Sequence, residues 1–405
     1  MTARYRMAVG PASDFPPPRF PAELRFVFAA ARMAGGRGDS AQLRKVADKV
    51  QDWDIALRGL AQHGLIGLVA PIVKRERVAP PDVLSSLEAR QSAHAVAVLM
   101  RVRELIRIVP ALEERRIRYL VIKGIPLSVQ LYADPAARGG RDIDIWVEPG
   151  RMGDAETMLA ELGYVLPIHA ARDASKGDAP PKESGWIHAE DRILVELHDR
   201  LTDNHELLPW DFGAMWELRE TVLIGGQPVS TMPRHRLPVY LAVHGTRHGW
   251  QRLMWLEDLT ALLDGREAFD RACADAKALG LEGMMLHVFW VLRHWLGLTV
   301  PDDLLARASR RIDTRLLNAL AARFHGGRGW YEDSPRNSLA RLLAGSLWTR
   351  AITYLMKPSA RYWGSQIAWE LDSPADRAFF ALPPRAAWLY PMLRPFGWAI
   401  RRLRR

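Results

Sequence analysis

Two aspartates, Asp142 and Asp144, stand one residue apart in the run Asp-Ile-Asp-Ile-Trp-Val that ends at Val147. The alternation of polar and apolar residues predicts a half-buried β-strand, with both carboxylates on one face and Ile143 and Ile145 in the core. Two carboxylates held so close repel each other unless a cation intervenes, and their oxygens suit Mg²⁺ or Mn²⁺. The pair indicates a divalent-metal clamp, although an isolated Asp-x-Asp is more often only solvated.

Two further motifs lie on either side of the aspartates. Lys123-Gly124 follows a β-prone run and precedes a helix-compatible stretch, which predicts a strand-to-helix turn where the backbone can approach a phosphate. Lys123 would add a positive charge there. Downstream, Glu196 and His198 alternate with apolar residues on another predicted strand. A third acid on a neighbouring strand would complete a two-metal site, in which one ion activates an acceptor hydroxyl and the other steadies a triphosphate.

This combination resembles the nucleotidyltransferase superfamily that includes DNA polymerase beta, whose pattern is a glycine turn, an acidic pair on the second strand and a later third acid. The superfamily usually has Asp where this chain has Glu196. A closer resemblance is to an uncharacterised bacterial nucleotidyltransferase family, and it covers residues 40–265. The matching motifs are Ile122-Lys-Gly124, Leu131-Tyr132, Arg138, Asp142–Val147, Gly163-Tyr164, Glu196-Leu-His198 and the helical block from Val243 to Leu259.

The resemblance implies transfer of a nucleoside monophosphate from an NTP to an acceptor, with release of pyrophosphate by a two-metal mechanism. It assigns Asp142 and Asp144 to both metals and Glu196 to the catalytic metal. The cofactor would be Mg²⁺ or Mn²⁺, and the NTP would be the donor substrate. The acceptor stays open, because a small molecule, a peptide, a protein or an RNA could each present a nucleophile to the same metals.

The resemblance also assigns residues to the phosphates. Lys123 and Gly124 would cradle the triphosphate. Arg138 and Arg141 are further phosphate candidates in a glycine-bearing segment, and the alternative for them is a solvated charge on a loop that is mobile without ligand.

A second cluster of polar residues lies on a predicted helix. His244 and His248 are four residues apart and share one face, so they could bind a metal with a third ligand, form a hydrogen-bonded structural pair or contact substrate. The acid of a zinc-protease helix is absent between them. Arg252, Asp258 and His198 are further candidates for substrate contact, and Asp258 could instead pair with Arg252 or orient a histidine.

Two non-catalytic hypotheses compete with the transferase. One is an inactive nucleotidyltransferase fold that binds a nucleotide or a partner protein, but crowded acids bring no advantage to a dead site. The other is contact with an anionic surface, nucleic acid or membrane, through residues 394–405, which hold five arginines and no acid. The alternative for this segment is a solvated, partly frayed tail.

The elements that would position these residues change type along the chain. Helical periodicity dominates both ends, and short β-prone runs dominate the middle. We expect an α+β protein with a small mixed β-sheet, the nucleotidyltransferase core, embedded between N-terminal and C-terminal α-helical regions. The expected parts are a flexible leader (1–20), an N-terminal helical region (21–115), the α+β core (116–235), a C-terminal helical domain (236–393) and a basic tail (394–405).

Composition limits the class of protein. Hydrophobic residues make up 48% of the 405 residues and charged residues 25%, which excludes a mainly disordered or fibrous chain. The formal charge of +10 favours an anionic partner. The single cysteine, Cys273, excludes an intramolecular disulfide and a multi-cysteine zinc site. With no secretory signal and no long apolar run, we expect a soluble, cytoplasmic protein.

Overall fold

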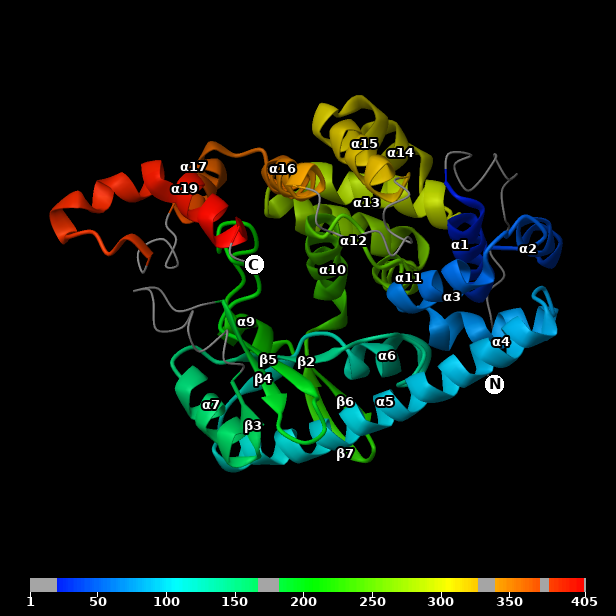
Figure 1. Ribbon diagram of the computed structural model, residues 1–405, viewed down its shortest axis with the longest axis horizontal. Coiled ribbons are helices and arrows are strands. Elements are labelled where there is room, and N and C mark those ends of the chain that lie inside the picture. The colour runs from blue at the N-terminus through cyan, green and yellow to red at the C-terminus, as the bar shows by residue number, and fades with distance from the viewer. Residues whose placement is uncertain (1–19, 167–181, 327–338, 372–378, 404–405) are drawn as a thin grey trace. The chain divides into compact units, whose positions relative to one another are not determined.

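The computed structural model describes residues 20–166, 182–326, 339–371 and 379–403 (Figure 1). Residues 1–19 of the predicted leader and the last two residues of the predicted basic tail lie outside these ranges. The described residues contain a seven-stranded mixed sheet, with helices before and after it in the chain. The predicted α+β class is therefore confirmed.

The described residues fall into two compact units, each assembled from separate stretches of the chain. One unit is drawn from Met1–Met100, Ser128–Gly140 and Arg234–Lys357, and the other from Arg101–Leu127, Arg141–Pro233 and Pro358–Arg405. Every strand of the sheet belongs to the second unit. The domain boundaries expected from the sequence stay predictions.

Two of the helices before the sheet begin at residues whose side chains cap them. Asp39 and Asp52 cap α2 and α3, because their carboxylates accept hydrogen bonds from the backbone N–H groups of Gln42 and Ile55. The bounds of these helices are α1 (Ala22–Ala34), α2 (Ser40–Ala47), α3 (Trp53–Gln62), α4 (Ile66–Glu76) and α5 (Pro81–Glu114).

The sheet has the order β3-β4-β5-β2-β1-β7-β6. The two central strands that carry the acids, β2 and β5, run parallel, and β1 is antiparallel to β2. The strands are β1 (Tyr119–Val121), β2 (Asp142–Val147), β3 (Tyr164–Val165), β4 (Glu183–His188), β5 (Leu194–His198), β6 (Glu220–Ile224) and β7 (Gln227–Thr231). Helices α6 (Ile125–Tyr132) and α7 (Met152–Glu161) connect β1 to β2 and β2 to β3.

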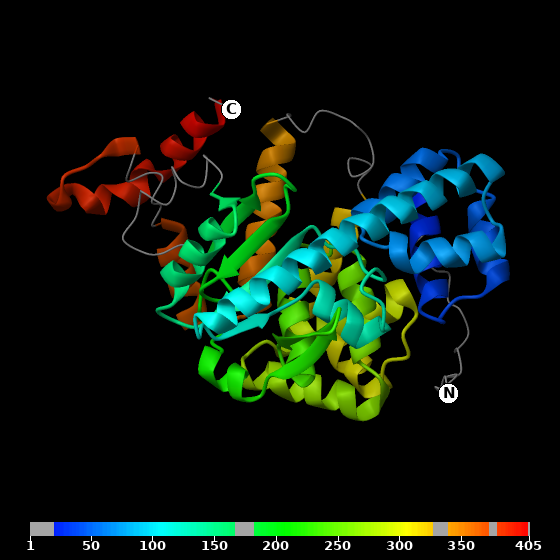
Figure 2. The ribbon, with the colours of Figure 1, turned by 90° about the horizontal axis from the view of Figure 1, so that it is seen from below.

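The part of α5 that belongs to the sheet unit covers the face of the sheet opposite the acids (Figure 2). Tyr119 of β1 shares that face with Ile145, and its hydroxyl donates to Glu113 of α5 at 3.3 Å. Tyr164 of β3 donates to Glu104 of α5 at 2.9 Å. The acidic side chains therefore project from the face of the sheet that α5 does not cover.

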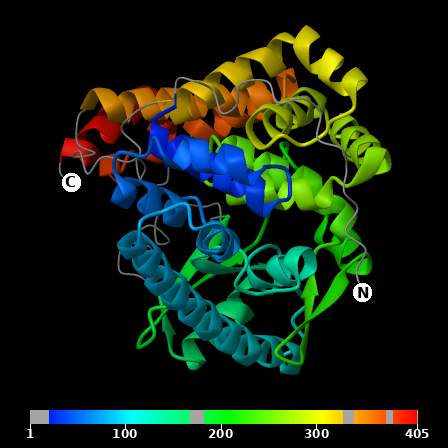
Figure 3. The ribbon, with the colours of Figure 1, turned by 90° about the vertical axis from the view of Figure 1, so that its right-hand side faces the viewer.

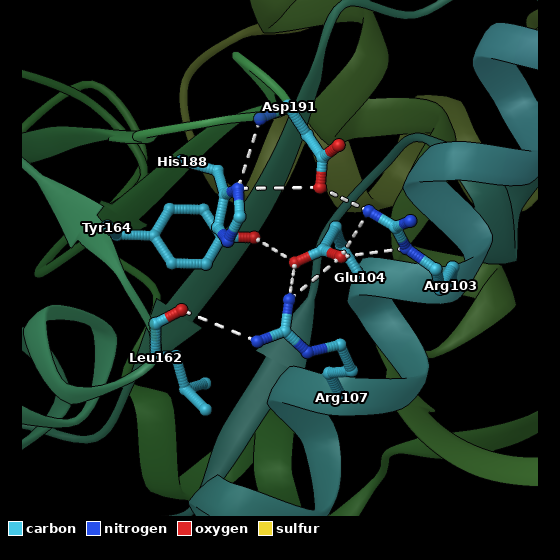
Figure 4. A network of polar contacts seen from close by, with 7 residues as sticks. All are labelled: Arg103, Glu104, Arg107, Leu162, Tyr164, His188 and Asp191. Carbon is cyan, nitrogen blue, oxygen red and sulfur yellow. Dashed lines mark hydrogen bonds and ion pairs between the residues drawn. The ribbon is translucent and has the colours of Figure 1, made fainter.

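Glu104 is the centre of a polar network between α5 and the edge of the sheet (Figure 4). Its side chain is fully buried, and its carboxylate accepts hydrogen bonds from Arg103, Arg107 and Tyr164. Arg103 also pairs with Asp191 in the turn between β4 and β5. A buried carboxylate needs such partners, so Glu104 fixes the position of this edge against α5.

The hairpin of β6 and β7 was not predicted from the sequence. Its two-residue turn is Gly225-Gly226, with φ values of 57° and 86°. Two consecutive residues with positive φ are typical of the primed turns that connect tight hairpins. The β-prone runs on either side of a Gly-Gly pair were the signal that could have identified this hairpin.

The chain after the sheet is helical. Helices α13, α14 and α15 of the first unit contact one another (Figure 3). Among the described residues, no helix combines the length and the apolar character that crossing a bilayer would need. The elements are α9 (Phe212–Glu217), which precedes β6, and then η1 (Arg234–Arg236), α10 (Leu237–Arg247), α11 (Met254–Leu262), α12 (Gly265–Ala278), α13 (Glu282–Leu296), α14 (Asp302–Arg310), α15 (Ile312–Gly326), α16 (Leu339–Met356), α17 (Ala360–Leu371), η3 (Pro384–Leu389) and α19 (Tyr390–Leu403).

Candidate metal and nucleotide site

The register between β2 and β5 brings the predicted acids together. Asp144 is the direct partner of Glu196, and Asp142 lies two residues before Asp144 on the same strand. His198 lies two residues after Glu196. Side chains alternate along a strand, so all four project from one face of the sheet. The apolar residues between them, such as Ile143, fill the opposite face.

Asp144 is fully buried, and its two carboxylate oxygens differ in their surroundings. Oδ1 lies 3.0 Å from Lys123 Nζ and 3.1 Å from His198 Nε2, which donates to it. Oδ2 has no hydrogen-bond partner among the described residues. Burial acts to raise the pKa of Asp144, but the charge of Lys123 and the hydrogen bond from His198 outweigh it and hold the pKa far below its ordinary value. Asp144 is therefore an ionised carboxylate with one buried oxygen that has no hydrogen-bond partner among the described residues.

Glu196 has the opposite electrostatic character. Burial and the negative charges of Asp144, Asp142 and Glu183 raise the pKa of Glu196 to about 8. Its Oε2 lies 3.8 Å from His198 Nε2. Ligand atoms of Asp144, Glu196 and His198 all lie within 4.8 Å of one another. The site thus brings two carboxylates and an imidazole into one small volume, a set of groups that could bind a divalent cation.

Glu183 joins this face although the sequence analysis did not identify it. It begins β4 and is the register partner of His198. Its Oε2 lies 3.4 Å from His198 Nδ1, an ion-pair distance without hydrogen-bond alignment, and 2.6 Å from Lys182 Nζ. Burial acts to raise the pKa of Glu183, and the charge of Lys182 outweighs it and lowers the pKa. The polar stretch around Glu183 resembles a loop in sequence, so only the pairing of β4 with β5 reveals its position.

Arg101 of α5 is a second residue that the sequence analysis missed. Burial lowers the pKa of this guanidinium, and the charge of Asp142 acts to raise it. Arg101 therefore lies within electrostatic reach of the half-buried Asp142. No local motif marks it, because it lies in the middle of a long helix far from Asp142 in the sequence.

Lys123-Gly124 forms the predicted turn between β1 and α6. Gly124 has a φ of 79°, and a Cβ there would meet only the carbonyl oxygen of Asp142, at 3.7 Å. The glycine is thus required by backbone conformation rather than by lack of space. The side chain of Lys123 points toward Asp144, with Nζ 3.0 Å from Oδ1. The assignment of both residues to a triphosphate stays a prediction.

Arg138 and Arg141 differ in their environments. Arg138 belongs to the first unit and is buried, and its guanidinium donates to Asp258 at 2.9 and 3.2 Å. Tyr132 also donates to Asp258, at 3.1 Å. The expectation of a solvated charge on a mobile loop is therefore wrong for Arg138, because burial and a bidentate partner fix its side chain. Arg141 is exposed and directly precedes β2 in the second unit.

Asp258 is fully buried on α11, within the block that was expected to contact substrate. Burial raises its pKa, and the charge of Arg138 acts against that rise. Arg252 or a histidine was the predicted partner of Asp258, whereas its carboxylate accepts hydrogen bonds from Arg138 and Tyr132. Arg252 itself is half-buried.

His244 and His248 share one face at the C-terminal end of α10. Their ring centroids are 4.8 Å apart, and the His244 ring packs edge-on against Trp255 at 4.7 Å. Within the described part of the chain, the only group of three or more potential metal ligands is that of Asp144, Glu196 and His198. The histidine pair therefore gains no third ligand from the described residues.

Comparison with known proteins agrees with this geometry. A family model described as "Uncharacterised nucleotidyltransferase" matches residues 49–297 of the 405 residues, which is more than half of the chain. The chain belongs to this uncharacterised nucleotidyltransferase family. The matched region includes β1, the acid-bearing strands β2 and β5, and also the block that holds His244 and His248. No curated protein matches the chain.

Proposed function

We propose that this nucleotidyltransferase transfers a nucleoside monophosphate from an NTP to an acceptor by a metal-dependent in-line displacement. The observation that carries the proposal is Asp144 Oδ2, a fully buried oxygen without a hydrogen-bond partner among the described residues. An unsatisfied buried carboxylate oxygen is costly, and a bound cation would satisfy it. The family membership supports nucleotidyl transfer in general.

The residues present fit Mg²⁺ or Mn²⁺. Asp144 Oδ2 and the Glu196 carboxylate offer hard oxygen ligands, and Asp142 projects from the same face. Two bound ions would polarise the α-phosphate and neutralise charge on the departing pyrophosphate. His198 donates to Asp144 Oδ1, and in doing so it orients the open oxygen toward the site.

The chain's own cations and backbone would position the triphosphate. Lys123 lies at the site, where its ammonium group pairs with Asp144, and it would also interact with a phosphate oxygen of the bound NTP. Gly124 turns the backbone into α6, whose first N–H groups favour a phosphate. Arg141, exposed before β2, is a further phosphate ligand in this proposal.

The proposed reaction forms one bond and breaks one. An acceptor oxygen or nitrogen attacks the α-phosphorus, the bond to the bridging oxygen of the β-phosphate breaks, and pyrophosphate leaves with the electron pair. The acceptor proton passes to solvent or to a carboxylate of the site. The acceptor is a small molecule, a peptide, a protein or an RNA, and we place the reaction in the cytoplasm, where NTPs are supplied.

The alternative, an inactive nucleotidyltransferase fold, is disfavoured because opposed, partly buried carboxylates destabilise the folded protein. Asp144 and Glu196 are held opposite each other, and burial together with the charge of Asp144 raises the pKa of Glu196. A protein that only bound a partner through its helices would be more stable with apolar residues at these positions.

Transfer of label separates nucleotidyl transfer from other reactions. Protein, Mg²⁺ and a metabolite and RNA extract are incubated with ATP or GTP labelled either at the α- or at the γ-phosphate. We expect the α-label to enter an acceptor and the γ-label to appear in pyrophosphate, and Asp144→Asn to abolish both. Transfer of γ-label to an acceptor, or equal α-label transfer by Asp144→Asn, would contradict the proposal.

A further inference from the structure

A small pocket in the first unit contains an arginine, Arg90, that has no anionic partner among the described residues. The turn between α3 and α4, the N-terminal half of α5 and Gly139 form the pocket, which has a volume of about 240 Å³ (Figure 1). All its lining residues belong to the first unit, and none belongs to the metal and nucleotide site. A water molecule takes up roughly 30 Å³ in the liquid, so the pocket has room for a small organic molecule.

Arg90 of α5 gives the pocket its positive charge. The residue is half-buried, and its Nε is a buried donor without a hydrogen-bond partner among the described residues. Within the described part of the chain, no acidic side chain forms an ion pair with its guanidinium. Buried donors and buried charges are normally paired, because leaving them unpaired destabilises the folded protein. The guanidinium therefore indicates an anionic ligand that is not part of the described chain.

Close backbone contacts fix the walls of this pocket. The N–H group of Gly139 donates to the carbonyl oxygen of Gly64 at 2.9 Å, and a Cβ at Gly139 would lie only 2.7 Å from Gly64 Cα. Glycine is therefore required at position 139 for the two segments to approach so closely. His94 of α5 donates from Nε2 to the carbonyl oxygen of Ala136 at 2.9 Å, which holds its ring in the wall. The pocket is thus formed without a ligand.

The other lining residues are mostly small and apolar. Gly64 and Ile66 are buried and form an apolar floor, whereas Ala61 and Ala93 are exposed at the mouth. Arg90 is the only lysine or arginine among the described lining residues. One guanidinium binds one carboxylate through two parallel hydrogen bonds. A phosphate monoester carries a charge of about −2 near neutral pH, so a single arginine would leave part of that charge unpaired.

We propose that this pocket binds a small organic monocarboxylate. The carboxylate pairs with the guanidinium of Arg90, and the apolar body of the ligand packs on Ile66. The proposal does not depend on nucleotidyl transfer, because the pocket shares no residue with the metal and nucleotide site. The alternative occupant is water, which would satisfy Arg90 Nε without any preference for a carboxylate.

Fluorine NMR titration of the full chain, without divalent metal, tests the proposal with three probes of similar shape. The probes are 4-fluorobenzoate, its neutral analogue 4-fluorobenzamide, and 4-fluorophenyl phosphate. We expect the wild type to bind the carboxylate at least tenfold more tightly than the amide, because only the carboxylate pairs with the guanidinium. This comparison needs no variant.

Two variants locate the binding of 4-fluorobenzoate. Arg90→Met removes the charge and keeps an unbranched side chain, and Ala93→Leu fills the mouth of the pocket from an exposed position. Each should weaken binding at least tenfold. The matched control is Arg271→Met, which removes an exposed arginine of the same unit that pairs with Glu267 outside the pocket. Its affinity should equal that of the wild type.

The thermal unfolding midpoint separates a ligand-binding arginine from a structural one. Without ligand, Arg90→Met should unfold at the wild-type temperature or above it, because the variant no longer buries an unpaired donor. A clearly lower midpoint would show that Arg90 stabilises the fold, and would overturn the proposal. Failure of the wild type to bind 4-fluorobenzoate, equal binding of the amide, or unchanged binding by Arg90→Met would also overturn it. Tighter, Arg90-dependent binding of 4-fluorophenyl phosphate would overturn the choice of a carboxylate.

Discussion

Lys123 and Asp144 form an ion pair at the end of β1 and the middle of β2, with Nζ 3.0 Å from Oδ1. Asp144 is fully buried and its second oxygen has no hydrogen-bond partner among the described residues, so the lysine neutralises the carboxylate without occupying that oxygen. A divalent cation at Oδ2 would share this carboxylate with Lys123. The positive charge of Lys123 thus opposes binding of a cation without nucleotide. It favours binding of a metal–nucleotide complex, because the negative phosphates attract both the lysine and the cation.

Replacement of Lys123 by Met should therefore change the two affinities in opposite directions. We expect Mn²⁺ alone to bind at least threefold more tightly, because a competing positive charge is removed, and Mg-ATP to bind at least tenfold more weakly. Isothermal titration calorimetry measures both. Lys182→Met is the control, since Lys182 pairs with Glu183 at the border of the site. Losses of both affinities in Lys123→Met would contradict this role.

Glu104 should contribute to stability rather than to activity. Glu104→Gln removes the buried charge that Arg103, Arg107 and Tyr164 share, and we expect a cost of about 1–3 kcal/mol, because the exposed arginines regain water. Urea unfolding followed by circular dichroism measures it. Glu161→Gln, at an exposed acid that pairs with Arg115, should stay within about 0.5 kcal/mol of wild type. Equal stability of both variants would refute the role of Glu104.

Acid should destabilise the helical unit through His287. Its Nε2 accepts from Trp250 Nε1 at 2.9 Å, its Nδ1 donates to Asn318 at 2.6 Å, and burial lowers its pKa to about 4. The folded pKa lies below the ordinary 6.5, so the unfolded chain takes up the proton first. The contribution, roughly 3 kcal/mol, is complete above pH 6.5 and is lost as the pH falls toward 4.

Unfolding midpoints measured from pH 8 to pH 4 test this prediction. His287→Gln keeps a donor and an acceptor but does not titrate, so its stability should fall less steeply below pH 6.5 than that of the wild type. Parallel curves for the two proteins would show that another group dominates the acid transition.

Arg138 and Asp258 should be coupled in stability. Each single change, Arg138→Gln or Asp258→Asn, leaves a buried charge without its partner and should cost about 3–5 kcal/mol, while the double variant should cost much less than the sum. Thermal and urea unfolding of the four proteins gives the coupling energy. Additive effects, with a selective rise in the KM for NTP in Arg138→Gln, would favour the phosphate assignment instead.

The sequence predicted the site best where acidic residues alternate with apolar ones at the two-residue period of a β-strand. The spacing of Asp142 and Asp144 predicted their strand, and the alternation around Glu196 predicted another, because period two is a local property of a strand. The burial of Asp144, in contrast, depends on residues distant in the sequence. Asp144 was expected on a half-buried strand but is fully buried, since Lys123 from the turn after β1 and His198 from the neighbouring strand β5 cover it.

Residues that reach the site only through strand register or helix packing could not be identified from the sequence. Glu183 reaches the site only because it pairs with His198, and Arg101 only because α5 passes near Asp142. The partner of Asp258 was equally hidden, because Arg138 is distant in sequence. The Gly225-Gly226 hairpin, in contrast, had a local signal that was overlooked.

The central claim is that Asp144 and Glu196 bind the divalent cation that carries the NTP. Calorimetric titration of Mn²⁺ and of Mg-ATP into wild type, Asp144→Asn and Glu196→Gln tests it most directly. Asp199→Asn is the control, one residue after His198 and paired with Arg200. We expect at least a hundredfold loss of Mn²⁺ affinity in Asp144→Asn and Glu196→Gln, and none in Asp199→Asn. Equal binding of Mn²⁺ and Mg-ATP by all four proteins would contradict it.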